Sequence, residues 1–247
     1  MSQVILKDLS LYYGENKKNL NCVLNNLNLT FHEQKINVII GPSGAGKTSI
    51  LKCISGALVY NGSIYFNNDC IDNLPIYKRG LGYLSQEFVL YPMYNVYDNI
   101  MYALKNKKID FEKADMKVKQ IANDLGLTYL LTRRIKQLSI GQASKVALAK
   151  ALLSSEDVLL LDEPFASLDL LNKQFLIKYI KEYAQKNHLT IILVTHDIKS
   201  ILSIGDYYYL FEEGKLHGEY DSQSILKSQN PLLRAIFMEE NYEKKKN

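Results

Sequence analysis

The segment Gly41–Thr48, with the sequence GPSGAGKT, constrains the fold of this chain more than any other feature. It fits the phosphate-binding pattern G-x-x-x-x-G-K-[ST], which needs a buried strand before it and a helix after it. Ile36–Ile40 has the aliphatic composition of a buried strand, and Lys47–Ala57 carries apolar residues at helical spacing. Glycines in such a loop let successive N–H groups curl around phosphate oxygens, and the helix N-terminus attracts the same anion. The segment therefore predicts an α/β domain that binds a phosphorylated ligand.

The loop and the start of the following helix supply the candidate nucleotide-binding residues. They are Gly41, Pro42, Ser43, Gly44, Ala45, Gly46, Lys47, Thr48 and Ser49. Lys47 is expected to neutralise charge on the outer phosphates, and the Thr48 hydroxyl is expected to ligate Mg²⁺. The alternative is a glycine-rich turn with an incidental lysine. The complete motif, placed between a predicted strand and a predicted helix, disfavours that alternative.

Length and composition fit one folded domain. The chain has 247 residues, of which 47% are hydrophobic and 23% are charged, and this is enough apolar material for a core. The formal net charge of +4 is too small to indicate nucleic-acid binding, and the chain has no dense stripe of lysine and arginine. Lys244–Lys246 form a basic tail, which we interpret as a solvated terminus rather than a membrane contact.

Cysteine usage and the lack of long apolar runs favour a cytosolic protein. Cys22, Cys53 and Cys70 are widely spaced and form no CxxC pair, so the spacing indicates neither a zinc site nor a disulfide framework. Reduced thiols are typical of the cytosol. The first residues lack the basic and apolar regions of a signal peptide, and no run approaches the apolar length that spans a bilayer.

Strands and helices alternate along most of the chain, which predicts a mainly parallel sheet covered on both faces. The first two predicted strands are antiparallel, and the last two form a hairpin that turns at Glu213 and Gly214. The predicted strands other than Ile36–Ile40 are Val4–Leu11, Leu27–Phe31, Ser63–Phe66, Val158–Leu161, Thr190–Thr195, Tyr207–Phe211 and Lys215–Tyr220. Two further predicted helices are Asn172–Lys186 and Asp197–Ser203.

Strand patterns fade after residue 87, and a mostly helical insert is predicted at about residues 87–153. Within it, Asp110 is a predicted helix cap and Gly126 a predicted stop, with apolar residues at helical spacing between them. The predicted fold is therefore an α/β domain of the P-loop NTPase type over residues 1–240. It has a mainly parallel sheet flanked by helices, an N-terminal antiparallel β subdomain, the helical insert and a basic tail at 241–247.

Acidic and histidine side chains follow two of the predicted strands. Asp162 stands at the end of Val158–Leu161 and can reach Mg²⁺ through water, while the adjacent Glu163 can polarise an attacking water as a general base. A strand that runs into an acidic turn gives the same pattern, but the phosphate loop upstream favours the catalytic interpretation. His196 follows Thr190–Thr195 at the edge where ligands bind in open α/β folds, although a lone histidine is more often structural.

Several short motifs together resemble the ABC ATPase family over nearly the whole chain. Leu138–Gln142, with the sequence LSIGQ, looks like the family signature LSGGQ and precedes a predicted helical run at Ala143–Leu153. Ser167–Asp169 matches the D-loop, His196 the switch histidine and Gln86 the Q-loop glutamine. Because these motifs occur in the family's order and spacing, the resemblance is specific even though each motif alone is short.

The resemblance implies a site shared between two chains. Two such domains dimerise head to tail around two ATP molecules, and Ser139 and the Gly141 backbone touch the terminal phosphate of the ATP that the other chain holds. The implied ATP-binding set further includes Tyr13, which stacks on adenine, together with Gln142 and Asp169. Tyr12 is the alternative to Tyr13, which directly precedes Gly14. The implied catalytic residues are Glu163, His196 and Gln86, and the implied Mg²⁺ ligands are Thr48, Gln86 and Asp162.

The chain departs from the family pattern at three places, which comprise five residues. Ile140 replaces the first glycine of the signature, and we expect this to cause modest damage at most. Ala143–Lys145 replaces the usual continuation rich in glutamine and arginine, and Lys150 stands where arginine is common. Lysine cannot reproduce the planar fork of a guanidinium, so some supporting hydrogen bonds are expected to differ.

What the ATPase drives has more than one interpretation. The favoured one is a transporter subunit, because Lys78–Ile100 resembles importer ATPases for small polar solutes such as osmoprotectants, sulfonates, polyamines and oxyanions. The alternatives are a cytosolic non-transport ATPase, such as that of iron–sulfur cluster assembly, or the motor of an exporter. A nucleic-acid-linked member is disfavoured, since Thr48 to Leu138 has no room for a long coiled coil and the chain holds a single set of motifs.

The importer interpretation implies several partners. They are a second nucleotide-binding subunit, identical or different, a polytopic membrane permease, and in some systems a solute-binding protein; no nucleic acid is expected. The chain would then lie on the cytoplasmic side of the cell membrane as a peripheral protein. The predicted permease-docking residues are Leu90, Tyr91, Met93 and Tyr94. The solute is not encoded here because its binding site lies on other chains.

Overall fold

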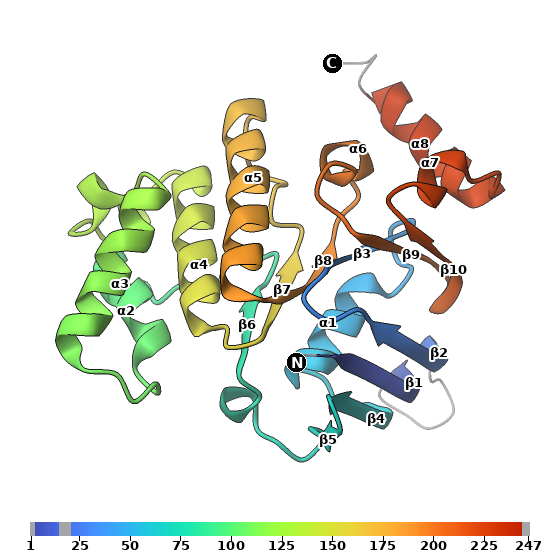
Figure 1. The fold of residues 1–247 in the computed structure, drawn as a ribbon, viewed down its shortest axis with the longest axis horizontal. Coiled ribbons are helices and arrows are strands. Elements are labelled where there is room, and N and C mark those ends of the chain that lie inside the picture. The colour runs from blue at the N-terminus through green and yellow to red at the C-terminus, as the bar shows by residue number, and fades with distance from the viewer. Residues whose placement is uncertain (1–2, 15–20, 244–247) are drawn as a thin grey trace.

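Two β-sheets lie next to each other, with helices around them (Figure 1). The computed structural model describes residues 3–14 and 21–243. Within these residues, an antiparallel sheet has the strand order β2–β1–β4–β5, and a six-stranded sheet has the order β10–β9–β3–β8–β7–β6. The first sheet contains β1 Val4–Tyr13, β2 Asn21–Phe31, β4 Asn61–Phe66 and β5 Asp69–Cys70. The second contains β3 Ile36–Ile40, β6 Leu81–Leu84, β7 Val158–Asp162, β8 Thr190–Val194, β9 Tyr207–Glu212 and β10 Lys215–Asp221.

The larger sheet is parallel except at one edge, where β10 pairs antiparallel with β9. Every residue of β3, β7 and β8 is buried, because other elements cover both faces of the sheet. Burial on both faces explains why these strands read as continuous aliphatic runs rather than as an alternation. The β9–β10 hairpin turns at Glu213 and Gly214, which both have positive φ. The predicted parallel sheet and the predicted hairpin are therefore confirmed.

The larger sheet separates two hydrophobic cores. Helix α1 (Lys47–Ser55) packs between the two sheets in one core. Helices α4 (Ile140–Ser154), α5 (Leu170–Asn187) and α6 (Ile198–Ile201) share the other core with the opposite face of the larger sheet. The remaining α-helices are α2 Val96–Met101, α3 Phe111–Asp124, α7 Ser224–Lys227 and α8 Pro231–Glu243. The 3₁₀ helices are η1 Ile76–Lys78, η2 Tyr102–Leu104, η3 Thr128–Leu130 and η4 Ile135–Gln137.

Residues 87–153, the predicted helical insert, contain α2, α3, α4 and three of the 3₁₀ helices and no strand of either sheet. Helix α3 buries one stripe of small and aliphatic side chains, Ala114, Val118, Ile121 and Ala122. Asp110 occupies its N-cap position, but its side chain makes no capping hydrogen bond. In the part of the chain that the structure describes, no helix is both long enough and apolar enough to cross a bilayer.

Some elements differ from the predicted ones. Strand β2 begins at Asn21 rather than Leu27, and β6 and α8 were not predicted. Strand β6 contains Gly82, a residue type that does not favour strands. A Cβ atom there would lie 2.1 Å from the carbonyl oxygen of Ala151, so glycine allows β6 to pack closely against α4. Helix α8 continues through Glu243 into the predicted tail, and Lys244–Lys246 lie outside the described residues.

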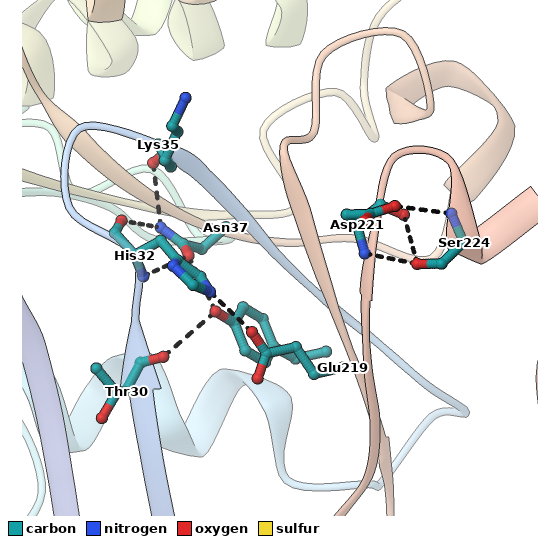
Figure 2. Close-up of polar contacts among 8 residues, drawn as sticks. Thr30, His32, Lys35, Asn37, Glu219, Asp221 and Ser224 are labelled. Carbon is teal, nitrogen blue, oxygen red and sulfur yellow. Dashed lines mark hydrogen bonds and ion pairs between the residues drawn. The ribbon is translucent and has the colours of Figure 1, made fainter.

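A polar network at the start of β3 ties the two sheets together (Figure 2). The Asn37 side chain accepts a hydrogen bond from the His32 N–H and donates one to the His32 carbonyl, both at 2.9 Å. The Tyr209 hydroxyl, from β9, donates to the Thr30 carbonyl at 3.3 Å. His32 Nε2 also lies 2.8 Å from Glu219 Oε1 on β10. The end of β2 is therefore fixed to three strands of the larger sheet, which positions the smaller sheet beside α1.

Candidate nucleotide-binding site

The phosphate loop is a tight turn that depends on glycine at two points. Gly41 has a φ of 153°, and a Cβ atom there would lie 2.1 Å from the Phe211 carbonyl oxygen. Gly46, at the N-cap position of α1, has a φ of 92°. The Lys47 ammonium donates to the carbonyl oxygens of Gly41 and Pro42, at 2.8 Å each. These two bonds hold the lysine against the loop, at the wall of the cavity described next.

A cavity of about 460 Å³ opens beside this loop. Gln86, Glu163 and His196 line it from the segments that follow β6, β7 and β8, because the carboxyl ends of parallel strands meet at one edge of a sheet. The rest of the lining is Val23, Ser43, Gly44, Gly46, Lys47, Thr48, Ser49 and Val194. The cavity therefore combines a cation, backbone N–H groups of a glycine loop, a carboxylate, an imidazole and an amide, which suits a polyphosphate and a water molecule.

Asp162 ends β7 below this cavity and is 1% exposed. Its Oδ1 accepts a hydrogen bond from the Thr48 hydroxyl at 3.0 Å. Its Oδ2 is buried and makes no hydrogen bond among the described residues, although the Tyr83 hydroxyl, also buried without one, lies close enough to interact with Asp162. Burial raises the pKa of Asp162, and the bond from Thr48 opposes that shift. A buried carboxylate oxygen that accepts no hydrogen bond, next to a hydroxyl oxygen, suits a hard cation or its water ligands.

These features fit Mg²⁺ held jointly with a nucleotide. The residues that the structure describes contain no group of three or more His, Cys, Asp or Glu side chains that would hold a metal ion without further ligands. Mg²⁺ in phosphate-binding loops takes few protein ligands, because phosphate oxygens and water complete its octahedron. The Thr48 hydroxyl and the Asp162 carboxylate lie side by side and are suitable as such ligands, and Gln86 lines the same cavity as Thr48.

Glu163 has an unusual backbone conformation for a residue with a side chain. Its φ is 49°, in the left-handed region, and its N–H donates to the Val194 carbonyl at 2.9 Å. The Glu163 side chain is 12% exposed, and its Oε1 lies 2.9 Å from Nδ1 of His196, which is 68% exposed. Strained backbone of this kind occurs at functional sites, where the surrounding structure enforces it. A carboxylate and an imidazole thus meet at the cavity wall, and each is a type of group that can accept a proton from a bound water.

Lys47 is the cation of the phosphate loop, and it interacts electrostatically with both Glu163 and Asp162. Burial lowers the pKa of Lys47, while the carboxylates of Glu163 and Asp162 oppose that change. An anionic ligand beside Lys47 would further favour its charged form. The site therefore pairs a partly buried cation with an acidic wall, so both a polyphosphate and its metal ion have an opposite charge nearby.

Tyr13 lies at the end of β1 and is 42% exposed, and it is not among the residues that line the cavity. Tyr12 is exposed to the same degree. Tyr13 pairs with Asn21 on β2, two residues before Val23, which does line the cavity. Residues 15–20 lie outside the described part of the chain. Stacking of Tyr13 on a base therefore stays a prediction.

The signature residues do not reach this cavity. Ser139 caps α4: its Oγ accepts from the Gln142 N–H at 3.2 Å, and Gln142 Oε1 accepts from the Ser139 N–H at 3.0 Å. This capping box leaves the helix N-terminus open to solvent, and Ile140 is exposed. Gly141 is also absent from the cavity lining. The first turn of α4 is thus accessible to solvent, and a helix N-terminus of this kind favours anions.

Asp169 caps α5 and connects it to the signature helix. Its two carboxylate oxygens accept from the Asn172 N–H at 2.9 Å and from the Asn172 side-chain amide at 2.6 Å, and these bonds lower the pKa of Asp169. Lys145 on α4 donates to Asn172 Oδ1 at 2.6 Å. Sequence reasoning noted Lys145 as a departure from a family pattern and did not find Asn172 or Val23. Aspartate is a preferred N-cap residue, so Asp169 itself signals a helix start, but no local pattern indicates the role of the Asn172 side chain.

Comparison with known proteins finds one family model and several relatives that match most of the chain. The family described as ABC transporter matches residues 24–166. The molybdate/tungstate import ATP-binding protein of Methanocaldococcus jannaschii is 39% identical over 213 residues, which cover 85% of this chain and 70% of that protein. The corresponding protein of Thermococcus kodakarensis is 39% identical over 180 residues, 72% of this chain and 54% of that protein. The spermidine/putrescine import ATP-binding protein of Clostridioides difficile is 34% identical over 236 residues, 95% of this chain and 67% of that protein.

The chain spans between about half and about two-thirds of the length of most of these relatives, as the covered shares of 54% and 67% show. Among solved structures, a dimeric bacterial ABC transporter cassette has a TM-score of 0.81 at 24% identity, with 89% of this chain and 98% of that chain covered. A dimeric cassette in a post-hydrolysis state, bound to ADP and phosphate, gives a TM-score of 0.80. At this identity the likeness concerns the fold, and it confirms the predicted fold class.

Proposed function

This chain belongs to the ABC transporter family of ATPases, and we propose that it hydrolyses ATP to drive the import of a small polar solute. The observation that carries the proposal is the cavity beside the phosphate loop, where Lys47, Glu163 and His196 converge from separate segments. Family membership supports the same activity, because the matched region contains both the phosphate loop and the Asp162–Glu163 pair.

The residues of the cavity have distinct roles in the proposed reaction. Backbone N–H groups of the loop and the Lys47 ammonium bind the phosphates of ATP. Thr48, Asp162 and Gln86 would hold Mg²⁺, which when bound would neutralise charge on the transferred phosphoryl group. Glu163 accepts a proton from the water whose oxygen attacks the terminal phosphorus, and ADP leaves with the bridging oxygen. His196, within hydrogen-bond distance of Glu163, orients that carboxylate and contacts the terminal phosphate.

The active unit is a head-to-tail dimer in this proposal. Ser139 and Gly141 line no part of the cavity of their own chain, yet they stand at an open helix N-terminus. A second copy can place this end against the terminal phosphate, because N–H groups at a helix start favour an anion. Ile140, Leu170 and Leu171 are large exposed apolar side chains at the signature and the start of α5, which supports contact with another protein surface.

Import is the direction that the relatives favour. Two relatives are named for molybdate and tungstate import and for spermidine and putrescine import, solutes of opposite charge. The similarity therefore supports an importer of small polar or ionic solutes and leaves the sign of the charge to other subunits. The partners in this proposal are a second cassette and a polytopic permease, with a solute-binding protein outside. The chain would work as a peripheral subunit on the cytoplasmic face of the membrane.

The permease would dock on the segment after Gln86. Met93 is 74% exposed and Val89 is also exposed there, so both can contact a partner. Tyr91 is half-buried, with its ring 4.5 Å from that of Tyr102, so part of its surface already packs inside the chain. Met93 is therefore a cleaner probe of docking than Tyr91, for which a substitution would also disturb internal packing.

The test is co-purification with membrane protein from detergent extracts of cells that express the tagged chain. Met93→Asp should keep nucleotide binding. The amount of polytopic subunit that co-purifies should fall by at least about tenfold, because a charge at an interface centre is strongly unfavourable. Met116→Asp is the matched control, since Met116 is an equally exposed methionine on α3. If the wild-type chain recovers only soluble proteins, the transporter proposal fails and a cytosolic assembly ATPase takes its place.

A further inference from the structure

Lys150 connects the signature helix to the segment that follows Gln86. It lies on α4, and its Nζ donates a hydrogen bond to the Val89 carbonyl at 3.0 Å. The same ammonium lies 4.1 Å from the ring centroid of Tyr91 and 5.8 Å from that of Tyr102. One side chain therefore spans from the middle of α4 to the loop and to η2.

The Lys150 ammonium is partly buried, so it depends on its contacts with Val89 and Tyr91 for stabilisation. Burial lowers the pKa of Lys150, and among the described residues no carboxylate lies within ion-pair distance of it. A cation removed from water must be compensated by hydrogen bonds or by aromatic faces. The Val89 carbonyl and the Tyr91 ring supply that compensation, so the loop and the lysine hold each other in place.

The same loop is held from its other side by Asn99 of α2, which is completely buried. Its Oδ1 accepts from the Tyr91 N–H at 2.8 Å, and its amide donates to the carbonyls of Tyr91 and Asn95 at 3.1 and 2.9 Å. The Tyr94 N–H also donates to the Tyr91 carbonyl at 3.1 Å. Segment 88–95 is thus clamped between α2 and α4, while Val89 and Met93 stay exposed on its outer surface.

We infer that Lys150 is a positioning residue that makes segment 88–95 move together with the signature helix. Binding of ATP between two chains would displace α4 through its first turn, and the Lys150–Val89 bond would carry that displacement to the exposed surface of the segment. This inference rests on the proposed function, because α4 responds to ATP only in the two-chain site. It explains how lysine serves at a position where a planar guanidinium was expected: the carbonyl and the tyrosine faces need a donor cation, not a fork.

Hydrogen exchange of the purified full chain tests the static part of the inference. The amides of Tyr91 and Tyr94 are hydrogen-bonded, so their exchange reports opening of the segment. Lys150→Met keeps the unbranched stem and removes the ammonium, and it should accelerate exchange at these amides by at least about fivefold. Lys150→Arg should restore protection, because a guanidinium can also donate to the carbonyl and stack on tyrosine.

Lys105→Met is the matched control. Lys105 is an exposed lysine whose Nζ lies 5.4 Å from the same Tyr102 ring, whereas the ammonium that donates to the Val89 carbonyl is that of Lys150. This variant should leave the exchange of Tyr91 and Tyr94 unchanged. Unchanged exchange in Lys150→Met, or equal acceleration in Lys105→Met, would overturn the inference. Should Lys150→Met not fold, Lys150→Gln is measured in its place under the same criteria.

The linked motion is tested in the Glu163→Gln background with ATP and Mg²⁺. ATP should slow exchange both in the first turn of α4 and in segment 88–95, and adding Lys150→Met should abolish the response of the segment alone. A segment that still responds after Lys150→Met would overturn the inference. Absence of any ATP response at α4 in the Glu163→Gln protein would instead contradict the two-chain site, while the nucleotide-free exchange of Lys150→Met would still decide the positioning role.

Discussion

The two parts of the ATP site, the phosphate-loop cavity and the signature turn, differ in how much of each one chain completes. In the cavity, Lys47 and Asp162 are buried, and Glu163 is held by Val194 and paired with His196. At the signature turn, Ser139 is exposed and bonds only within its own helix. Folding of a single chain therefore fixes the groups that we propose bind phosphate and activate water, whereas in the proposed dimer the signature functions only through contact with a second chain.

The largest effect is expected when the proposed general base, Glu163, is removed from the phosphate-loop cavity. Glu163→Gln should leave ATP binding nearly unchanged and reduce hydrolysis by about 10²–10⁴-fold, since a positioned general base contributes about that much. Phosphate release at saturating ATP and Mg²⁺ measures the effect, and Glu182→Gln, an exposed glutamate on α5, is the control. Near-normal turnover in Glu163→Gln would remove Glu163 from the role of base.

Mixing two inactive variants tests whether the signature turn of one chain completes the phosphate-loop site of another. Ser139→Arg blocks the signature and Lys47→Ala the loop, so a mixed dimer keeps one intact site. An equal mixture should recover at most about a quarter of wild-type ATPase activity, because about half of the dimers are mixed and each has one working site of two. ATPase activity at a fixed total concentration is the measurement. Recovery of no activity above the two single variants would contradict a site shared between chains.

The buried carboxylate of Asp162 should lower the free energy of unfolding when no ligand is bound. Because burial raises the folded-state pKa of Asp162 above its unfolded value, its stabilising contribution is present at low pH and is lost as pH rises through the folded pKa. Asp162→Asn should therefore raise the Tm of the ligand-free protein at neutral pH, and the gain should shrink in acid. A gain of about 1 kcal/mol corresponds to about 2–4 °C for a chain of this size.

Thermal denaturation across a pH series, without nucleotide and Mg²⁺, measures this difference. Addition of ATP and Mg²⁺ should then stabilise the wild-type chain more than Asp162→Asn, because the variant lacks the carboxylate that supports the cation. If Asp162→Asn is less stable than wild type by the same amount at neutral and acidic pH, ionisation of Asp162 does not lower the stability of the folded chain.

The smallest effect is expected at the signature position that departs from the family pattern. Ile140 is 70% exposed and is the first residue of α4, so its side chain contributes little to the fold of one chain. Ile140→Gly should change the free energy of unfolding by less than about 1 kcal/mol and ATPase activity by less than about threefold. Steady-state ATPase assays and denaturant unfolding check both. An activity change of more than about tenfold would show that Ile140 itself contacts the nucleotide or the second chain.

Patterns carried by neighbouring residues were predicted well. The phosphate loop, the buried strand before it and the Asp162–Glu163 pair were each visible because a strand of aliphatic residues and a glycine-rich turn are encoded locally. Strand β6 and the first residues of β2 were missed, since Gly82 and Asn21 carry no strand preference of their own and are held by pairing with β7 and β1. Docking by Tyr91 was predicted without the knowledge that Lys150 covers part of its ring.

The sequence by itself determined the fold class and was enough to predict the candidate phosphate-binding and acidic residues, because motif order and local periodicity do not depend on distant contacts. Only the tertiary structure decided that Glu163 adopts a positive φ against Val194, that Lys145 reaches Asn172, and that Lys150 holds Val89. Each of these contacts joins residues far apart along the chain. The parallel sheet and its packed helices set their distances, and no local pattern of residue types encodes that packing.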